Sequence, residues 1–306
     1  MLKGKTFFTW KGLLLWSNHF YGIAAALLSL ETHLAIFKTA PSLYLVVFIY
    51  TSTVVYYTYA YFDEIEIGIY NERSQWYIQN KRYLKLRQFV LIVVGLYIAF
   101  IKLKVIEVFF SLTPLLKFII ILTLLISFFY QCAHLLFKRL QIRNKGLLKS
   151  LSITWVWVVM CGVIPLLVNA NGPFNLNSFR NYIFLYLLQL FSFILILAIL
   201  FDIKDLNRDS DEKVKTLIVR YGIKPTMCKL VFPLLFLYLA LSLFIFFRIE
   251  ESPLYLITTF LILFSTLLVI NFVQKRTVIH ESILLIDGLI IFKALIGIIR
   301  LLLVLG

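Results

Sequence analysis

The feature that most constrains this chain is a series of apolar stretches, each close to the length of a membrane crossing. A transmembrane α-helix needs about 20 consecutive apolar residues. Charged residues make up only 15% of the 306-residue chain, whereas a soluble domain contains about 25%. The sequence therefore predicts an all-α, polytopic membrane protein with about nine transmembrane helices in one bundle. We place the helices at residues 12–30, 42–62, 88–106, 114–132, 151–169, 182–201, 230–247, 254–273 and 284–305.

The third and fourth apolar stretches are interrupted by charged residues, which are Lys102, Lys104, Glu107 and Lys117. A long hairpin with a tilted or broken helix is therefore the alternative for this part of the chain. No repeat of fixed period and no low-complexity linker divides the sequence. We expect a single domain over residues 1–306.

Positive charge is distributed unevenly along the chain, whose net charge is +15. Of the 30 Lys and Arg residues, 22 precede the first apolar stretch or lie in the alternate connections 63–87, 133–150, 202–229 and 274–283. Basic connections stay on the cytoplasmic side of a membrane. We therefore expect a cytoplasmic N-terminus, an outside C-terminus and a bacterial plasma membrane as the location. Topology accounts for the charge, so no nucleic-acid partner is expected.

An acidic segment with regularly spaced carboxylates directly follows the sixth apolar stretch. If that helix continues, Asp202, Asp205 and Asp209 lie within about 60° of one another on its surface. Such a row needs a positive partner, and carboxylate oxygens suit Mg²⁺, whose shell is often completed by substrate phosphates. The alternative is a solvated loop of mixed charge. Basic residues that would neutralise remaining phosphate charge are Lys204, Arg208, Lys213, Lys215 and Arg220.

This segment resembles the second aspartate-rich motif of the UbiA family of intramembrane prenyltransferases, D-x-x-D-x-x-x-D-x-x-x-G-x-x-T-L-x-V-x-x-G. The match needs no gap, and Lys213 in place of the glycine is its one departure. The matching residues are Asp202, Asp205, Asp209, Thr216, Leu217, Val219 and Gly222. The resemblance implies a UbiA-like fold, a polyprenyl diphosphate donor and Mg²⁺ as cofactor, with the three aspartates as catalytic metal ligands.

The first aspartate-rich motif of the family, N-D-x-x-D-x-x-x-D at the end of the second helix, is only partly present. When the motif is aligned on Asp63, its other positions hold Tyr59, Ala60 and Ile67. Glu66 follows Asp63 by three residues and would place a second carboxylate on the same helix face. The resemblance implies that Asp63 is catalytic and binds metal. Glu66 is either a further metal ligand or a solvated side chain.

The resemblance also implies diphosphate-binding cations on the face formed by the connections 63–87, 133–150 and 202–229. The candidates are Arg73, Lys138, Lys145, Lys213 and Arg220, with Arg73 and Lys138 as first choices. Membrane topology alone would also explain these residues. The implied reaction is a Mg²⁺-dependent transfer of a polyprenyl group to a hydrophobic acceptor within the lipid bilayer. An aromatic acceptor is the family's common choice, and a glycerol phosphate is the less common one.

Two other functions remain open. A catalytically silent UbiA-like relative is favoured by the incomplete first motif. A membrane transporter would carry ionisable groups near the middle of the membrane, whereas the acidic residues of this chain are predicted to cluster at helix ends. A phosphatidyl-group transferase is disfavoured, because its D-G-x-x-A-R signature does not occur in the sequence.

Overall fold

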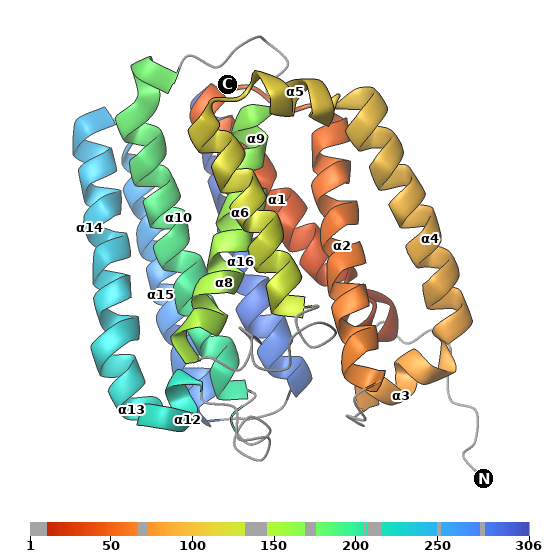
Figure 1. The fold of residues 1–306 in the computed structure, drawn as a ribbon. Coiled ribbons are helices and arrows are strands. Elements are labelled where there is room, and N and C mark those ends of the chain that lie inside the picture. The colour runs from red at the N-terminus through yellow and green to blue at the C-terminus, as the bar shows by residue number, and fades with distance from the viewer. Residues whose placement is uncertain are drawn as a thin grey trace.

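The helices of the computed structural model lie side by side and cross the molecule in alternating directions (Figure 1). The structure describes residues 11–66, 72–131, 146–168, 176–204, 206, 216–249, 252–275 and 279–305, and no strand occurs in these ranges. The α-helices are α1 (His19–Phe37), α2 (Leu43–Glu66), α3 (Glu72–Gln79), α4 (Lys81–Tyr97), α5 (Val105–Ser111), α6 (Pro114–Gln131), α8 (Gly146–Val158), α9 (Ile164–Leu167), α10 (Leu176–Lys204), α12 (Leu217–Tyr221), α13 (Ile223–Thr226), α14 (Phe232–Ile249), α15 (Pro253–Lys275) and α16 (Ile279–Leu305). Short π-helical segments are η1 (Lys11–Trp16), η2 (Ile98–Lys102), η4 (Val159–Val163) and η5 (Met227–Val231).

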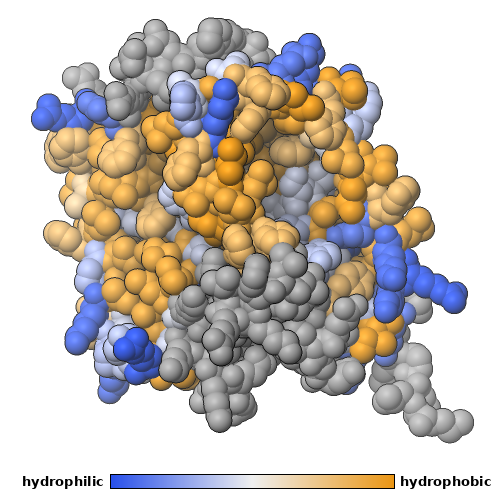
Figure 2. Space-filling view, viewed as in Figure 1, coloured by the Kyte–Doolittle hydropathy of each residue, from blue (hydrophilic) through white to orange (hydrophobic). Residues whose placement is uncertain are grey.

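The long helices have the dimensions and the surface of a membrane bundle. Within the described ranges, 8 helical segments are long and apolar enough to cross a membrane, and the shorter apolar segment Pro114–Tyr130 forms most of α6. Phe236 and Phe247 are 72% and 74% exposed, which would be unfavourable in water. Figure 2 shows a broad hydrophobic belt with hydrophilic residues towards both ends of the helices. The chain is therefore a multi-pass integral membrane protein.

Some predicted boundaries were wrong. The first crossing helix spans His19–Phe37 and the third Lys81–Lys102, where the sequence predicted 12–30 and 88–106. The predicted connections 63–87 and 202–229 contain the short helices α3, α12 and α13. When helices are placed from apolar stretches in the sequence, a charged residue is taken as a helix end. In the structure, a helix can continue past a charged residue whose side chain has a partner inside the bundle. In the region for which a hairpin was the alternative, the chain forms the crossing helix that begins with α4, the short helix α5 and then α6.

The centre of the bundle is α10, which packs against α8, α14, α15 and α16. Residues 193–200 of this helix are apolar on every face, as expected for a helix surrounded by other helices. Fully buried side chains along it are Leu190, Phe193, Ile196, Ile199 and Leu200. At the neighbouring α1–α2 contact, a Cβ added to Gly22 would lie 2.6 Å from Val54 Cγ2. Glycine at this position therefore allows the two helices to approach closely.

We call the end of the bundle at which α2 and α10 end and α8 begins the motif end. The short helices α3, α12 and α13 also lie there, at the lower end of Figure 1, while α5 and the last turn of α16 lie at the opposite end. The alternating crossings thus bring the ends of α2 and α10, which carry the two acidic motifs, to the same end of the molecule.

Candidate functional site

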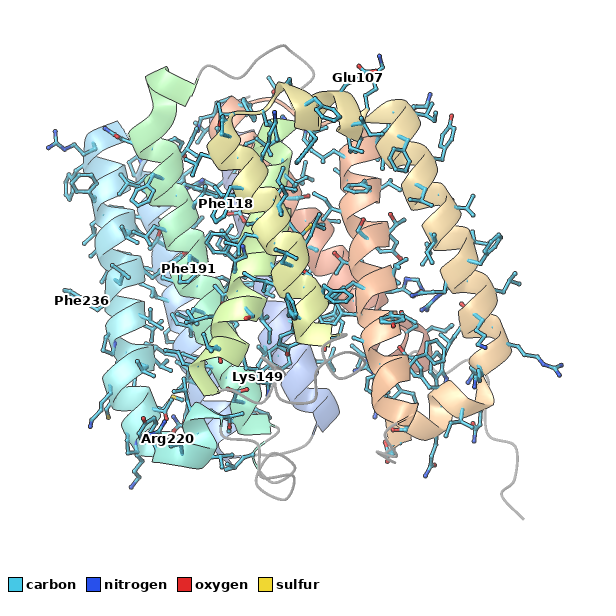
Figure 3. All side chains as sticks on the ribbon, viewed as in Figure 1. Glu107, Phe118, Lys149, Phe191, Arg220 and Phe236 are labelled. Atoms are coloured by element: carbon cyan, nitrogen blue, oxygen red, sulfur yellow. The ribbon has the colours of Figure 1, made fainter. Side chains whose placement is uncertain are left out.

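A buried ion pair fixes the first aspartate of the second motif. Asp202, in the last turn of α10, is 1% exposed. Its Oδ1 lies 2.9 Å from Lys149 Nζ, and its Oδ2 accepts a hydrogen bond of 3.3 Å from Ser150 Oγ. Both partners belong to the first turn and a half of α8, and Figure 3 shows Lys149 at the motif end. Because an unpaired buried carboxylate is costly, this pair holds α8 and α10 together.

The second half of the motif builds a short helix beside this ion pair. Thr216 is the N-cap of α12, and its side chain accepts a hydrogen bond of 3.4 Å from the backbone N–H of Val219. Leu217 and Ile218 are buried, and α12 packs against α8 and α10. Gly222 ends the helix with φ of 83°, a conformation that favours glycine. These motif positions therefore return the chain to the α8–α10 contact after the acidic residues.

Several predicted site residues lie outside the part of the chain that the structure describes; they are Asp205, Asp209, Lys138, Lys145 and Lys213. Asp63 and Glu66 lie in the last turn of α2 at the motif end, and their side chains are outside the described part. Arg220, at the end of α12, is exposed and lies 5.1 Å from the ring centroid of Tyr221. No ion pair joins Arg220 to a carboxylate among the described residues.

Arg73, a first-choice diphosphate ligand, lies in α3 at the motif end and makes internal contacts. Its Nη2 donates to Asn18 Oδ1 and, over 3.5 Å, to the carbonyl of Trp16. The guanidinium carbon lies 4.0 Å from the ring centroid of Tyr61. Arg73 therefore ties α3 to the start of α1 and to the last turns of α2, and it brings a positive charge close to the helix turn that carries Asp63.

Asn18 is the centre of a wider polar network that the sequence did not indicate. It has φ of 66°, a conformation that asparagine tolerates better than most residues. Its Nδ2 donates to Thr58 Oγ1 (3.1 Å) and to Tyr77 Oη (2.8 Å). Thr58 Oγ1 also accepts from Arg87 Nη2 at 2.9 Å. Burial raises the pKa of Tyr77, so its hydroxyl stays neutral. The network joins α1, α2, α3 and α4 at the motif end.

An aromatic cluster lies deeper in the bundle, between α1, α2 and α8. The rings of Tyr21 and Tyr57 stack with centroids 4.6 Å apart, and Trp157 Nε1 donates to Tyr57 Oη over 2.8 Å. Along α2, Tyr57 is about 9 Å from Asp63, and along α8, Trp157 is about 12 Å from Lys149. The cluster thus lies about two helix turns deeper in the bundle than the polar residues of the motif end.

The structure supplies part of the donor set that a divalent metal would need. No cluster of three or more His, Cys, Asp or Glu side chains suited to a metal ion occurs among the described residues. Asp202 is the one member of the predicted aspartate set whose side chain is described, and Lys149 balances its charge. Carboxylate oxygens from Asp202, Asp205 and Asp209 are the donors that Mg²⁺ prefers. The residue types therefore fit the ion.

Sequence reasoning missed Lys149 and Ser150, because they were assigned to the connection 133–150. The helix that they begin starts at Gly146, five residues before the apolar stretch that was used to place it. The sequence did contain an indication that Lys149 belongs to this helix, because Lys149 is the basic residue nearest to that stretch.

Sequence reasoning also missed ionisable residues inside the bundle. Glu31 and Asp287 are buried within crossing segments, so the expectation that acidic residues cluster at helix ends was wrong for them. Lys293 and Arg300 are buried in α16 as well. Charges inside the last apolar stretch were a visible signal, since such residues are costly in a membrane and mark functional or structural contacts.

Comparison with known proteins shows similarity at the level of structure. No protein-family model matches the chain, and no match was found among curated protein sequences. A UbiA homologue from Aeropyrum pernix K1 in its apo form is similar with a TM-score of 0.60 and 16% identity, over 95% of this chain and 98% of that chain. A UbiA homologue from Archaeoglobus fulgidus bound to Cd²⁺ gives 0.59 and 14%, with the same coverages. A digeranylgeranylglyceryl phosphate synthase gives 0.51 and 17%, over 95% of this chain and 94% of that chain. The chain therefore has a UbiA-like fold.

Proposed function

We propose that this protein transfers a polyprenyl group from a polyprenyl diphosphate to a hydrophobic acceptor with an aromatic ring, in a Mg²⁺-dependent reaction at the motif end. The observation that carries the proposal is the buried Lys149–Asp202 pair at the first position of an ungapped aspartate-rich motif. We further propose that residues 63–87, 133–150 and 202–229 form the active-site face and that this face is cytoplasmic. The strong excess of Lys and Arg in these segments supports that orientation.

The proposed diphosphate site combines acidic and basic side chains. Asp202, Asp205 and Asp209 would hold Mg²⁺, with Asp63 and Glu66 contributing from α2. When bound, the ion stabilises the negative charge of the leaving diphosphate. Lys149 contacts the first aspartate of the motif in the structure, and we add it to the predicted ligands. Its ammonium, held at the motif end by Asp202, would donate to phosphate oxygens of a bound diphosphate.

Arg73 would bind phosphate from α3, since its guanidinium lies at the same end of the bundle as Asp202 and stacks on Tyr61. Lys138, Lys145, Lys213 and Arg220 remain proposed ligands on the strength of their position in the basic segments. Together with Lys149 they would neutralise a diphosphate that carries more negative charge than a single divalent ion balances.

We propose that the aromatic cluster lies beside the first isoprene unit of a bound donor. Departure of diphosphate leaves cationic character on the allylic carbon, and the faces of aromatic rings attract cations. Tyr21, Tyr57 and Trp157 lie on the membrane side of the motif end, where the lipid-soluble chain of a donor would extend. We propose that these rings surround the reacting carbon and keep water away from it.

Two features of the structural relatives support this function. One UbiA homologue was solved with Cd²⁺, a divalent cation, and another similar structure is that of a digeranylgeranylglyceryl phosphate synthase. At 14% to 17% identity, these similarities concern the fold. The proposed roles of individual residues rest on the motif and the contacts of this chain.

The test is a transfer assay with the purified protein in lipid nanodiscs. The assay contains Mg²⁺, labelled prenyl diphosphates of several chain lengths and either an aromatic acceptor or a glycerol phosphate, and products are identified by mass spectrometry. We expect prenylated aromatic product from the wild type and none from Asp205→Ala or Asp209→Ala. The matched control is Glu107→Gln, which removes an exposed carboxylate of α5 at the opposite end of the molecule (Figure 3).

The same assay separates the alternatives. Prenylated glycerol phosphate alone would keep the reaction type and replace the acceptor class. Absence of any product, together with inserted and folded wild-type protein, would favour a catalytically silent relative or a transporter. Equal activity of the aspartate variants and the wild type would remove the metal role of the second motif.

A further inference from the structure

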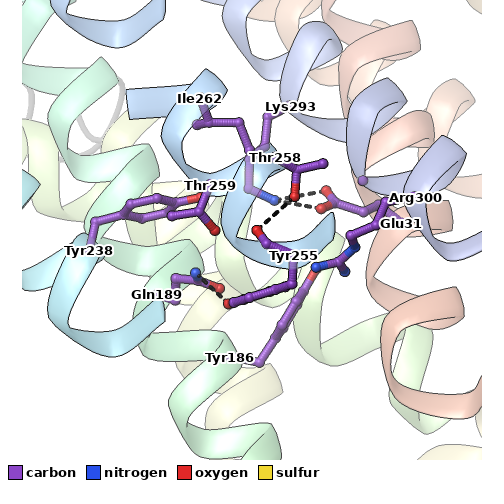
Figure 4. Close-up of a pocket in the computed structure, with 11 residues that line it drawn as sticks. Glu31, Tyr186, Gln189, Tyr238, Tyr255, Thr258, Thr259, Ile262, Lys293 and Arg300 are labelled. Carbon is purple, nitrogen blue, oxygen red and sulfur yellow. Dashed lines mark hydrogen bonds and ion pairs between the residues drawn. The ribbon is translucent and has the colours of Figure 1, made fainter. Parts of the chain in front are cut away.

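A small polar cavity of about 20 Å³ lies inside the bundle, between α1, α10, α14, α15 and α16 (Figure 4). The cavity lies away from the motif end, because Gln189, one of the residues that line it, is about 20 Å from Asp202 along α10. Three of its lining residues carry charge, namely Glu31, Lys293 and Arg300. Charged groups at this depth are costly in a membrane, so their arrangement calls for a physical explanation.

Two of the charges neutralise each other. Lys293 Nζ lies 2.9 Å from Glu31 Oε1 and 2.8 Å from Glu31 Oε2, and both side chains are buried. Gly297, one turn after Lys293, has no side chain at the point where α1 approaches, and a Cβ there would collide with the Glu31 carboxylate. The sequence thus makes room for this carboxylate beside α16.

Arg300 is the third charge, and it has no anionic partner among the described residues. It is 6% exposed, its Nε has no hydrogen-bond partner, and its guanidinium carbon lies 4.6 Å from the ring centroid of Tyr255. Stacking on a ring offsets part of the cost of burial but does not neutralise the charge. The charged side chains lining the cavity therefore sum to one excess positive charge. Asp287, a buried acid of α16, is not among the lining residues.

We propose that this cavity binds one small monoatomic anion such as chloride. An anion would balance the excess charge and accept hydrogen bonds from Arg300 and from the remaining donor of Lys293. The volume decides the size of the occupant, because about 20 Å³ accommodates a single water or halide and excludes a diphosphate or a lipid headgroup. The site would stabilise the contact of α1, α15 and α16, independently of any transfer reaction at the motif end.

The first test measures the thermal unfolding midpoint of the purified protein in sodium chloride and in sodium gluconate at equal ionic strength. We expect chloride to raise the wild-type midpoint by about 2 to 4 °C, as ligand binding to the folded state does. Arg300→Gln should lose this chloride dependence. The matched control is Arg248→Gln, because Arg248 is exposed at the end of α14 and also lies over a ring, that of Phe244, at 5.6 Å. This variant should keep the full chloride effect.

The second test uses the wild type alone, so it does not depend on how well Arg300→Gln folds. Crystals grown in sodium bromide should show an anomalous peak inside the cavity, next to Arg300. Equal midpoints in the two salts, a chloride effect that persists in Arg300→Gln, or a bromide peak elsewhere with none in the cavity would each overturn the proposal, since the cavity would then hold water.

Discussion

The motif end and the interior cavity contain the same interaction in two different settings. Each has a buried lysine paired with a buried carboxylate, Lys149 with Asp202 at 2.9 Å and Lys293 with Glu31 at 2.8 Å. The first pair is followed along the chain by the two other aspartates of the motif, Asp205 and Asp209, and the second is accompanied by Arg300. Additional carboxylates beside a pair suit a cation, and an additional guanidinium suits an anion. The groups that accompany a pair, rather than the pair itself, therefore indicate the ligand.

The largest expected effect concerns the proposed metal site at the motif end. Removal of Mg²⁺ by a chelator, or the substitution Asp205→Ala, should lower prenyl transfer by about 1,000-fold or more, because metal stabilisation of the leaving group contributes several kcal/mol. Initial rates of product formation measure this effect. Chelation should leave the chloride dependence of unfolding unchanged, and a parallel loss of both would mean that the two regions are not separate.

The next effect concerns Lys149. In Lys149→Met, transfer should fall about 10- to 100-fold through loss of a charge-assisted contact to phosphate, and stability should fall by about 3 to 5 kcal/mol because the buried Asp202 loses its ion pair with Lys149. The double variant Lys149→Met/Asp202→Asn should recover much of the stability and none of the activity. Recovery of activity along with stability would show that Lys149 is only a structural partner of Asp202.

Breaking the interior pair should affect stability by a similar amount. Glu31→Gln leaves two buried cations beside the cavity, and we expect a loss of about 3 to 5 kcal/mol, measured by thermal unfolding. The double variant Glu31→Gln/Lys293→Met should recover part of it. The exposed pair Lys104–Glu107, at 3.4 Å, is the matched comparison, since breaking it should cost less than about 1 kcal/mol. Equal losses would contradict the burial of the interior pair.

The smallest effect concerns the cap of α12. Thr216→Ala removes the acceptor for the Val219 amide and should cost about 1 kcal/mol, with a few-fold loss of transfer because α12 directly follows the acidic residues in the chain. Thr216→Ser keeps the oxygen and should behave as the wild type. A Thr216→Ser variant as impaired as Thr216→Ala would mean that the methyl group of the buried threonine matters instead of the cap.

The same comparison explains how much could be predicted from sequence. Residues 202–222 are contiguous, so the aspartate-rich motif could be matched from the sequence alone, but the helix α12 within it was not predicted. The hydrophobic stretches indicated the crossing helices. The Glu31–Lys293 pair joins residues 262 positions apart, which no local pattern reveals. Prediction also ended the first helix at residue 30, because Glu31 looked like a boundary when its partner was unknown.

Lys149 is an intermediate case. Its position near an apolar stretch is visible in the sequence. The start of a helix is difficult to predict when its first turn contains polar residues, and the sequence suggested Lys138 and Lys145 as ligands from the same connection. The role of Asn18 could not be predicted from the sequence, since it depends on a left-handed backbone conformation and on contacts with α2 and α3.

The most direct test of the central claim is the binding of a non-reactive polyprenyl diphosphate analogue to the purified protein, measured by calorimetry with and without Mg²⁺. The account predicts binding that requires Mg²⁺, is lost in Asp205→Ala and is retained in Glu107→Gln. Binding of equal strength without the metal, or in Asp205→Ala, would contradict a cation and diphosphate site at the motif end.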